Sequence, residues 1–247
     1  MVENLIFGIE KIKEKSMASL IIEDLHLLNK IDIELIESRT KLKVLNGIKV
    51  LVCFLPLVLN NIYKILNEDL KQKEILIIGD DEELTKEVIE SLHKEVRFIT
   101  LVGDYENSIE SISKYILEKT GLSVFYSKNI LKILKNYSII INLKIKTCID
   151  MSQLRRKAIV FDFSIGKVFS KSIDRRKEAL IIEDFMFKAN DLNIRENEWM
   201  GYLVSSYICE HFYLSKAIEP EALVVNGSLY SIEDFVDYQR GKKTVST

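Results

Sequence analysis

The chain has little of the residues that punctuate or cross-link a fold. Its 247 residues include only two prolines, nine glycines and three cysteines. The cysteines, Cys53, Cys148 and Cys209, are far apart and odd in number, which excludes a disulfide framework and a Cys-x-x-Cys metal or redox motif. We therefore expect a reducing, cytoplasmic location and no metal centre.

The chain also lacks an excess of either charge. Its 35 basic and 37 acidic residues leave a net charge of −2, which gives no electrostatic reason to expect nucleic acid or an anionic membrane. The first residues show no cationic leader followed by an apolar stretch. The most apolar run, residues 50–59, is shorter than the roughly 20 residues of a membrane span. We expect neither nucleic acid nor a membrane as partner, and we interpret this run as a buried element of the core.

Apolar spacing divides the chain into two regimes. Up to residue 29 the apolar residues recur every three or four positions, as in amphipathic helices, and this spacing returns at residues 57–66. A stretch rich in β-branched residues lies between them, at residues 41–52, around an Asn46-Gly47 turn. The polar segment 67–73 then marks a boundary. We predict a mainly helical N-terminal lobe over residues 1–72.

From residue 73 onward, short runs rich in Ile and Val alternate with helical segments. Runs without polar alternation are typical of strands that are buried on both faces of a parallel sheet. The pattern predicts six strands, at residues 74–79, 96–102, 122–126, 138–143, 158–163 and 179–182. Helices are predicted at residues 82–93, 108–119 and 129–136. The expected fold is α/β, with a doubly wound, mainly parallel Rossmann-like sheet over residues 73–190.

The C-terminal segment, residues 191–247, is expected to contain a long helix over residues 197–217. We expect this helix to pack back on the N-terminal lobe and to complete with it a second, smaller lobe. A frayed tail is expected after residue 240.

In a doubly wound sheet the ligand lies where the strands end, and dinucleotides require Gly-x-Gly-x-x-Gly after the first strand. This chain has instead Gly79-Asp80-Asp81-Glu82-Glu83-Leu84. Only the first glycine remains, and four carboxylates stand where a helix N-terminus would attract a pyrophosphate. Acidic residues suit a helix cap and the helix dipole. The pattern predicts an acidic cap at Asp80 or Asp81 and a degenerate dinucleotide site.

Several polar residues at the predicted strand ends keep two other functions open. Asp104 follows the second strand, where an acid holds the ribose 2′-hydroxyl of a dinucleotide. For an NAD(P)-dependent enzyme, the candidate cofactor-binding residues are Gly79, Asp81, Asp104 and Asn142, and the weak catalytic candidates are Asp162 and Cys209. S-adenosylmethionine, which has no pyrophosphate, is a further alternative. The absence of a closing antiparallel hairpin from the predicted strands speaks against it.

The histidines and the basic clusters carry no recognisable chemistry. His26, His93 and His211 are isolated in the sequence, so we expect them to be structural or exposed. The basic clusters are interpreted as solvated faces or a tail; they are Arg155-Arg156-Lys157, Arg175-Arg176-Lys177, and Arg240 with Lys242 and Lys243.

Four segments carry a resemblance to a known family. They are Ile75-Leu76-Ile77-Ile78-Gly79, Ser138-Ile139-Ile140-Ile141-Asn142, residues 158–162 with 175–182, and residues 200–214. Their succession resembles the nucleotide-binding half of the shikimate dehydrogenase and glutamyl-tRNA reductase type. It is most similar to long-chain acyl-carrier-protein reductases and related predicted amino-acid dehydrogenases.

The resemblance implies a Rossmann domain, an NAD(P) cofactor and an active cysteine on the last helix, at the position of Cys209 or Tyr207. The chain departs from the family at the glycine-rich turn, and again at Glu183-Asp184-Phe185, where the family has glycines. The leading hypothesis is therefore a Rossmann-like protein that works by binding an unknown small molecule or protein, without catalysis. A homo-oligomer is compatible with this hypothesis.

Overall fold

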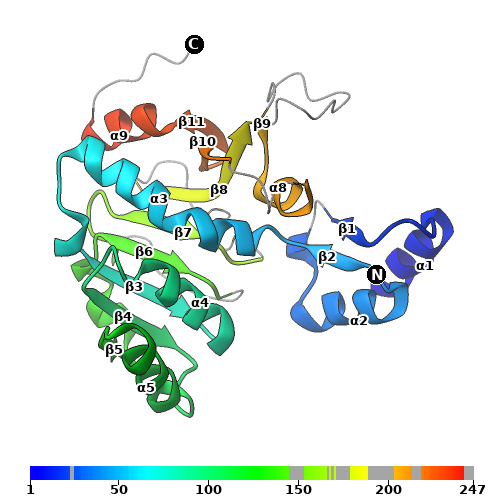
Figure 1. Cartoon of the computed structure of the whole chain (residues 1–247), viewed down its shortest axis with the longest axis horizontal. Coiled ribbons are helices and arrows are strands. Elements are labelled where there is room, and N and C mark those ends of the chain that lie inside the picture. The colour runs from blue at the N-terminus through cyan, green and yellow to red at the C-terminus, as the bar shows by residue number, and fades with distance from the viewer. Residues whose placement is uncertain are drawn as a thin grey trace.

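The computed structural model describes residues 1–22, 25–144, 153–165, 167, 170, 179–188, 203–212 and 218–241, and for His26 it describes only the backbone. Figure 1 shows a large sheet covered by helices, with a smaller N-terminal unit projecting from one side. Cys148, Arg175, Arg176 and Lys177 lie outside the described residues, as do Lys242 and Lys243.

Six parallel strands form the centre of the main sheet. They are β3 (Glu74–Gly79), β4 (Phe98–Gly103), β5 (Val124–Tyr126), β6 (Ile139–Asn142), β7 (Ile159–Asp162) and β8 (Leu180–Lys188). Their spatial order is β5-β4-β3-β6-β7-β8, which is the 3-2-1-4-5-6 order of a Rossmann sheet. The predicted α/β fold is confirmed, and the order reverses between β3 and β6, where such sheets bind ligands.

Both faces of this sheet are buried because neighbouring residues of a strand point to opposite sides. In β3, Ile75 and Ile77 face one core, and Leu76 and Ile78 face another. The first core is covered by α3 (Ile48–Leu66), α4 (Glu82–Leu92), α5 (Ile109–Thr120) and α9 (Ile232–Arg240). The second is covered by α6 (Ile130–Ile133) and the short 3-10 helix η3 (Leu134–Asn136). The two-sided burial explains why the strands are apolar without alternation.

Helix α3 differs from its sequence interpretation in position and length. It starts at Ile48, directly after Gly47 (φ 72°), and continues through Pro56 for 19 residues. Leu55 and Leu59, on its buried stripe, are fully buried in the core of the sheet. Residues 48–66 therefore belong to the sheet domain and not to the predicted N-terminal lobe, because the apolar stripe of α3 continues across Pro56.

The length of α3 also changes the comparison with a membrane span. Among the described residues it is the one helix long and apolar enough to cross a membrane, with a mean hydropathy of 1.6 over its window. Half of that window is buried inside the protein. The run of residues 50–59 is therefore part of a core helix, as interpreted from the sequence.

The N-terminal unit has its own small core. It contains α1 (Val2–Ile12), β1 (Ser19–Ile21), the 3-10 helix η1 (Leu25–Leu27), α2 (Lys30–Thr40) and β2 (Lys43–Leu45). Ile6, Ile9, Leu28, Ile36, Leu42 and Val44 are buried together there. The helical spacing around residues 20–21 was misleading, because this segment is a strand that pairs in parallel with β2. In Figure 1 the unit lies beside the start of α3, to the right of the sheet.

The C-terminal segment contains strands where one long helix was predicted. Within its described residues are β9 (Leu203–Val204), α8 (Ser206–Phe212), β10 (Pro220–Val225), β11 (Ser228–Ser231) and α9. β9 pairs with β8, so the helix cannot extend across residues 203–204. β10 and β11 form an antiparallel hairpin at the edge of the sheet, next to β8. The closing hairpin that the sequence interpretation found missing is therefore present.

Helix α8 contacts the N-terminal unit. Glu210 is 6% exposed, and its carboxylate accepts hydrogen bonds from the backbone amide of Gly47 and from Nζ of Lys43, each at 3.0 Å. This carboxylate joins α8 to the link between β2 and α3.

We expect Glu210→Ala to lower the free energy of unfolding by about 1–2 kcal/mol, because the buried amide of Gly47 loses its acceptor. Urea denaturation measures the change. Glu233→Ala, at an exposed position in the first turn of α9, is the control and should change stability by less than about 0.5 kcal/mol. Equal effects of the two substitutions would mean that Glu210 does not join the elements.

Candidate functional site

Four parallel strands end at one edge of the sheet and bring the predicted site residues together. Gly79 of β3 is in register with Gly103 of β4, and Asn142 of β6 is in register with Asp162 of β7. Asp104 follows β4 directly. Gly79, Asp81, Asp104, Asn142 and Asp162 therefore lie at or just after the carboxyl ends of neighbouring strands. Their roles in binding or catalysis stay predictions.

The acidic turn after β3 caps helix α4. The Asp81 carboxylate accepts the backbone N–H of Leu84 at 3.0 Å, and its other oxygen binds Nζ of Lys30 at 3.1 Å. Burial by itself would raise the pKa of Asp81, but these two contacts hold it below its usual value. The predicted cap is confirmed at Asp81. The Lys30 ammonium comes from the first residue of α2, so the N-terminal unit contacts this turn through an ion pair.

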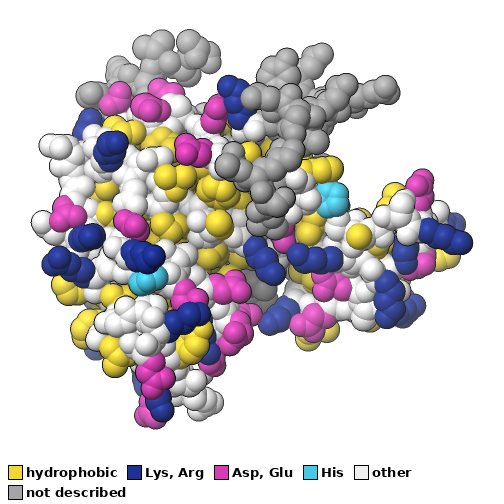
Figure 2. All heavy atoms as spheres, in the orientation of Figure 1, with side chains coloured by type: hydrophobic (Ala, Val, Ile, Leu, Met, Phe, Trp, Pro, Cys, Tyr) yellow, Lys and Arg dark blue, Asp and Glu magenta, His cyan; other side chains and the backbone are white. Residues whose placement is uncertain are grey.

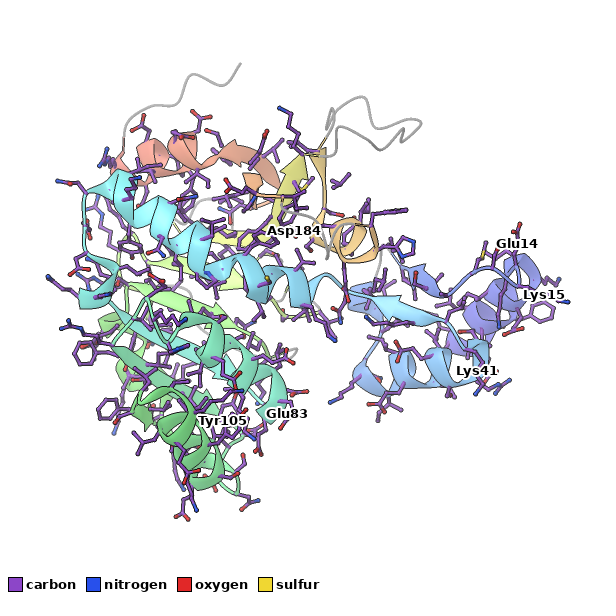
Figure 3. All side chains as sticks on the ribbon, viewed as in Figure 1. Glu14, Lys15, Lys41, Glu83, Tyr105 and Asp184 are labelled. Carbon is purple, nitrogen blue, oxygen red and sulfur yellow. The ribbon has the colours of Figure 1, made fainter. Side chains whose placement is uncertain are left out.

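A tyrosine fills the space beside Gly79. A Cβ atom built on Gly79 would lie 2.2 Å from the hydroxyl oxygen of Tyr105. That hydroxyl is 2.6 Å from Oγ1 of Thr85, and Tyr105 and Thr85 are both buried. Burial raises the pKa of Tyr105, so the phenol stays protonated. Figure 3 labels Tyr105 close to Glu83, which lies in the first turn of α4. The sequence analysis did not single out this residue, although it directly follows Gly103-Asp104.

Three carboxylates and two lysines lie together over the turn. Nζ of Lys144 lies 2.6 Å from Oδ2 of Asp104. Asp80 lies among these groups, and partial burial raises its pKa. The carboxylates of Asp104 and Asp81 raise that pKa further, whereas Lys144 and Lys30 lower it. The two lysines are already engaged by Asp81 and Asp104, so the three carboxylates leave the turn with a net negative charge.

Replacing Asp80 with asparagine is expected to stabilise the protein at neutral pH. The folded-state pKa of Asp80 is raised, so its ionised form costs folding free energy above that pKa, and this cost is absent below the unfolded-state pKa. Because the side chain is largely exposed, the expected gain at pH 7 is at most about 0.5 kcal/mol, and it should disappear as the pH falls through the acid range. Urea unfolding at several pH values measures it. An equal gain for Glu87→Gln, at an exposed position of α4, would assign the effect to net charge.

Asn142 and Asp162 form a buried polar pair at the ends of β6 and β7. Nδ2 of Asn142 donates to Oδ1 of Asp162 at 3.0 Å, and the Ser164 hydroxyl donates to the same oxygen at 2.6 Å. Both residues are fully buried, and Oδ1 of Asn142 accepts the backbone N–H of Lys144. These contacts hold the two strand ends and the following turns in place. They give Asp162 a structural task in addition to its candidacy as a catalytic residue.

Cys209 lies away from the Gly79 turn, on α8. It is 1% exposed, and burial raises the pKa of its thiol to about 12, with Asp184 raising it further. A thiol with this pKa is almost entirely protonated at neutral pH and is a poor nucleophile. Tyr207, the alternative position on the same helix, is half-buried.

A lysine that the sequence analysis passed over lies between β7 and β8. Nζ of Lys167 donates to the carbonyl oxygens of Asp162 and Glu183, at 2.9 and 2.7 Å. Burial lowers the pKa of Lys167, and the nearby Asp184 and Asp162 carboxylates oppose this. Burial raises the pKa of Asp184, which Figure 3 places near α8. The lysine ties two neighbouring strands together through their backbone.

The described histidine side chains lie on separate elements and contact different partners. Nδ1 of His93 lies 2.6 Å from the carbonyl oxygen of Glu90, at the end of α4. Nδ1 of His211 lies 2.9 Å from Oγ of Ser19. In the part of the chain that the structure describes, no group of three or more His, Cys, Asp or Glu side chains is placed to hold a metal ion.

Comparisons with known proteins give a distant likeness in fold. No family model matches the chain, and no curated protein matches it in sequence. Δ1-pyrroline-2-carboxylate reductase from Thermococcus litoralis is 10% identical, with a TM-score of 0.35 over 46% of this chain and 35% of its own. L-tryptophan dehydrogenase from Nostoc punctiforme is 15% identical, with a TM-score of 0.35 over 53% and 38%. Shikimate 5-dehydrogenase from Listeria monocytogenes is 12% identical, with a TM-score of 0.31 over 65% and 63%.

The chain thus spans little more than a third of the length of the first two proteins. These distant likenesses, to dehydrogenases and reductases that include shikimate dehydrogenases, concern the fold alone. The function of this chain therefore depends on the residues at the site.

The residues at the carboxyl edge do not fit the pyrophosphate of a dinucleotide. Pyrophosphate binding needs free backbone amides at the helix N-terminus and space for close approach at the glycines. Here the Leu84 amide is taken by Asp81, and Asp81 itself stands at the position of the second glycine, where the backbone would approach a pyrophosphate. Asp104, at the place of a ribose-binding acid, is paired with Lys144. The groups that would bind a dinucleotide bind one another.

Proposed function

We propose that this chain is a Rossmann-like protein that acts by binding, without catalysis, and whose dinucleotide site has been converted into a structural network of aspartates and lysines. One observation carries the proposal: Asp81 caps α4 with one carboxylate oxygen and binds Lys30 with the other. The anion-binding end of the helix is thereby used within the protein.

Electrostatics supports the loss of the dinucleotide. A pyrophosphate at this turn would lie beside Asp80 and Asp81, and a like charge at 4–6 Å costs roughly 1–4 kcal/mol at intermediate effective dielectric. Two such neighbours together cost about 2–8 kcal/mol, which weakens binding by a factor of about thirty to several hundred thousand. Lys30 and Lys144 offset this only if they leave Asp81 and Asp104.

Titration of the purified protein with NADH and NADPH, followed by nucleotide fluorescence and calorimetry, tests the proposal. We expect dissociation constants weaker than about 1 mM for both. The double variant Asp80→Asn, Asp81→Asn keeps a side-chain cap on α4 and removes two charges, so it should bind NADPH more tightly than the wild type. Micromolar binding by the wild type would overturn the proposal. If Asp104→Ala then abolished that binding, an NAD(P)-dependent oxidoreductase with an unusual cofactor turn would replace it.

S-adenosylmethionine is a second candidate ligand of the same edge. It carries a positive sulfonium and no pyrophosphate, so carboxylates at the turn repel it less. The antiparallel β10–β11 hairpin also removes the topological argument against it. Calorimetric titration with S-adenosylmethionine distinguishes the two proposals, because micromolar affinity would favour this one. In either case we propose a cytoplasmic protein whose partner is a small molecule or a protein, with neither nucleic acid nor membrane as partner.

A further inference from the structure

A basic pocket lies at the opposite edge of the sheet, where the parallel strands begin. Its volume is about 280 Å³, close to the lower end of the roughly 300–1,000 Å³ of small-molecule sites. The walls come from the end of α3 and the turn after it, from Ser138 before β6, from residues 155–157 before β7, and from the end of α9. Segments far apart in the sequence therefore build one concave site.

Positive charge is concentrated in this pocket, although the whole chain is slightly acidic. Five lining residues are cationic: Lys73, Arg155, Arg156, Lys157 and Arg240. Of the described residues that line it, only Glu68 carries a carboxylate, and that carboxylate is paired with Lys73. Figure 2 shows Lys and Arg side chains along the left-hand side of the molecule, where α3 ends and the chain turns toward β3. Charge of one sign in a concave site selects an anion.

Hydrogen bonds within the protein hold this wall in place. Arg240 donates to the carbonyl oxygen of Ile65, a neutral acceptor, so this bond does not neutralise the guanidinium charge. Nε2 of Gln239 donates to the carbonyl oxygen of Lys157 at 3.2 Å. Lys157 has a φ of 64°, a left-handed conformation that non-glycine residues adopt only where neighbouring contacts impose it. The basic loop is therefore fixed against α9.

Besides its positive charges, the pocket contains neutral polar groups that a ligand can contact. Oε1 of Gln239 is buried and has no hydrogen-bond partner among the residues that the structure describes. A buried acceptor without a partner is costly, and a ligand hydroxyl or N–H would satisfy it. The hydroxyls of Tyr63 and Ser138 are hydrogen-bonded to each other, which leaves this pair one hydroxyl hydrogen for a ligand. Burial raises the pKa of Tyr63 to about 12. The pocket thus offers cations, a hydroxyl donor and one carbonyl-type acceptor.

We propose that this pocket binds a small organic phosphate. Its phosphoryl group lies among Arg155, Arg156 and Arg240, and a ligand hydroxyl donates to Oε1 of Gln239. Guanidinium groups match phosphate oxygens in pairs, which favours arginine for this anion. The limited volume favours a metabolite over a nucleic acid or an acidic protein. The proposal goes beyond the proposed function, because it assigns a ligand site away from the Gly79 turn.

Isothermal titration calorimetry of the full chain with ribose 5-phosphate, inorganic phosphate and ribose tests the proposal. We expect ribose 5-phosphate to bind at least tenfold more tightly than inorganic phosphate, and ribose not to bind. The double variant Arg155→Ala, Arg240→Ala should lower the affinity for ribose 5-phosphate at least tenfold. The control double variant Lys114→Ala, Lys132→Ala makes the same change of charge at exposed positions on α5 and α6, and should leave the affinity unchanged.

Arg155→Lys provides a milder variant if the double variant fails to fold. It keeps the charge but loses the planar pair of donors, so it should weaken ribose 5-phosphate several-fold. Gln239→Met should lower the affinity for ribose 5-phosphate to that for inorganic phosphate.

The proposal is wrong if the wild type binds no ribose 5-phosphate at millimolar concentration, or if the two double variants bind it equally. Binding of a short DNA duplex in place of ribose 5-phosphate also overturns it. These probes carry neither adenine nor nicotinamide, and the substituted residues lie at the other edge of the sheet. Their failure leaves the proposed function standing, and NADPH binding at Gly79 leaves this pocket standing.

Discussion

Gly103→Ala is expected to destabilise the protein by about 3 kcal/mol or more, because two independent effects add at this position. Gly103 has a φ of 135°, which L-residues rarely adopt. A Cβ atom built there would lie 1.8 Å from the carbonyl oxygen of Gly79, so the backbone of β3 or β4 must shift. That shift would also disturb the bond from the Asp104 amide to the same carbonyl oxygen. Urea or thermal unfolding followed by circular dichroism measures the loss.

Gly121→Ala separates the two effects. Gly121 also has a positive φ, 74°, but a Cβ atom there would meet nothing within 4 Å. This control should therefore cost about 1 kcal/mol, from backbone conformation alone. If both variants lost the same stability, the close approach of β4 to Gly79 would not constrain the carboxyl edge of the sheet. A larger loss for Gly103→Ala ties the two strand ends together as one rigid platform.

The central sheet could be predicted from the sequence because its signal is local. Strand β3 coincides with its predicted bounds, and the other parallel strands start or end within a few residues of theirs. Residues of both faces are buried in a run such as Ile75 to Ile78, so the run is apolar throughout and cannot be taken for an amphipathic helix or strand. Spacing alone was insufficient at β1, which is strand because it pairs with β2.

The C-terminal hairpin was missed although the chain carries a local signal for it. β10 and β11 are joined by Asn226 and Gly227, both with positive φ (49° and 75°), as a two-residue hairpin turn requires. Helical spacing in the preceding segment drew the interpretation toward one long helix. Since β9 pairs with β8, and β10 pairs with β8 as well, tertiary contacts decide the structure of this segment.

The candidate site could be predicted in its position and only partly in its chemistry. Strand ends located Gly79, Asn142 and Asp162 at one edge, and the acidic run indicated the helix cap. The partners of those residues could not be predicted, because Lys30 is 51 positions from Asp81 and Lys144 is 40 positions from Asp104. The same holds for the basic pocket, where Arg155 and Arg240 meet only in the folded chain. No local pattern encodes such pairs.

Asp162→Ala is expected to lower the free energy of unfolding by about 3 kcal/mol, since it leaves buried donors without their acceptor. Oδ1 of Asp162 accepts from Asn142 and Ser164, and Oδ2 accepts the backbone N–H of Ser170 at 3.4 Å. The carboxylate is fully buried, so water cannot replace it for these donors. Asp162→Asn keeps one acceptor oxygen and should lose about half as much. Urea unfolding of the three proteins measures the series.

Asp104→Ala is the matched control, because Asp104 is also an aspartate at a strand end. Its side chain is 74% exposed and forms an ion pair with Lys144. An exposed ion pair contributes less than about 1 kcal/mol, so this variant should stay close to the wild type. Comparing the stability losses of Asp162→Ala and Asp104→Ala shows whether the buried carboxylate of Asp162 stabilises the fold. If Asp162→Ala were as stable as Asp104→Ala, the buried carboxylate would have no structural task, and a catalytic role for Asp162 would become the better explanation of its burial beside Asn142.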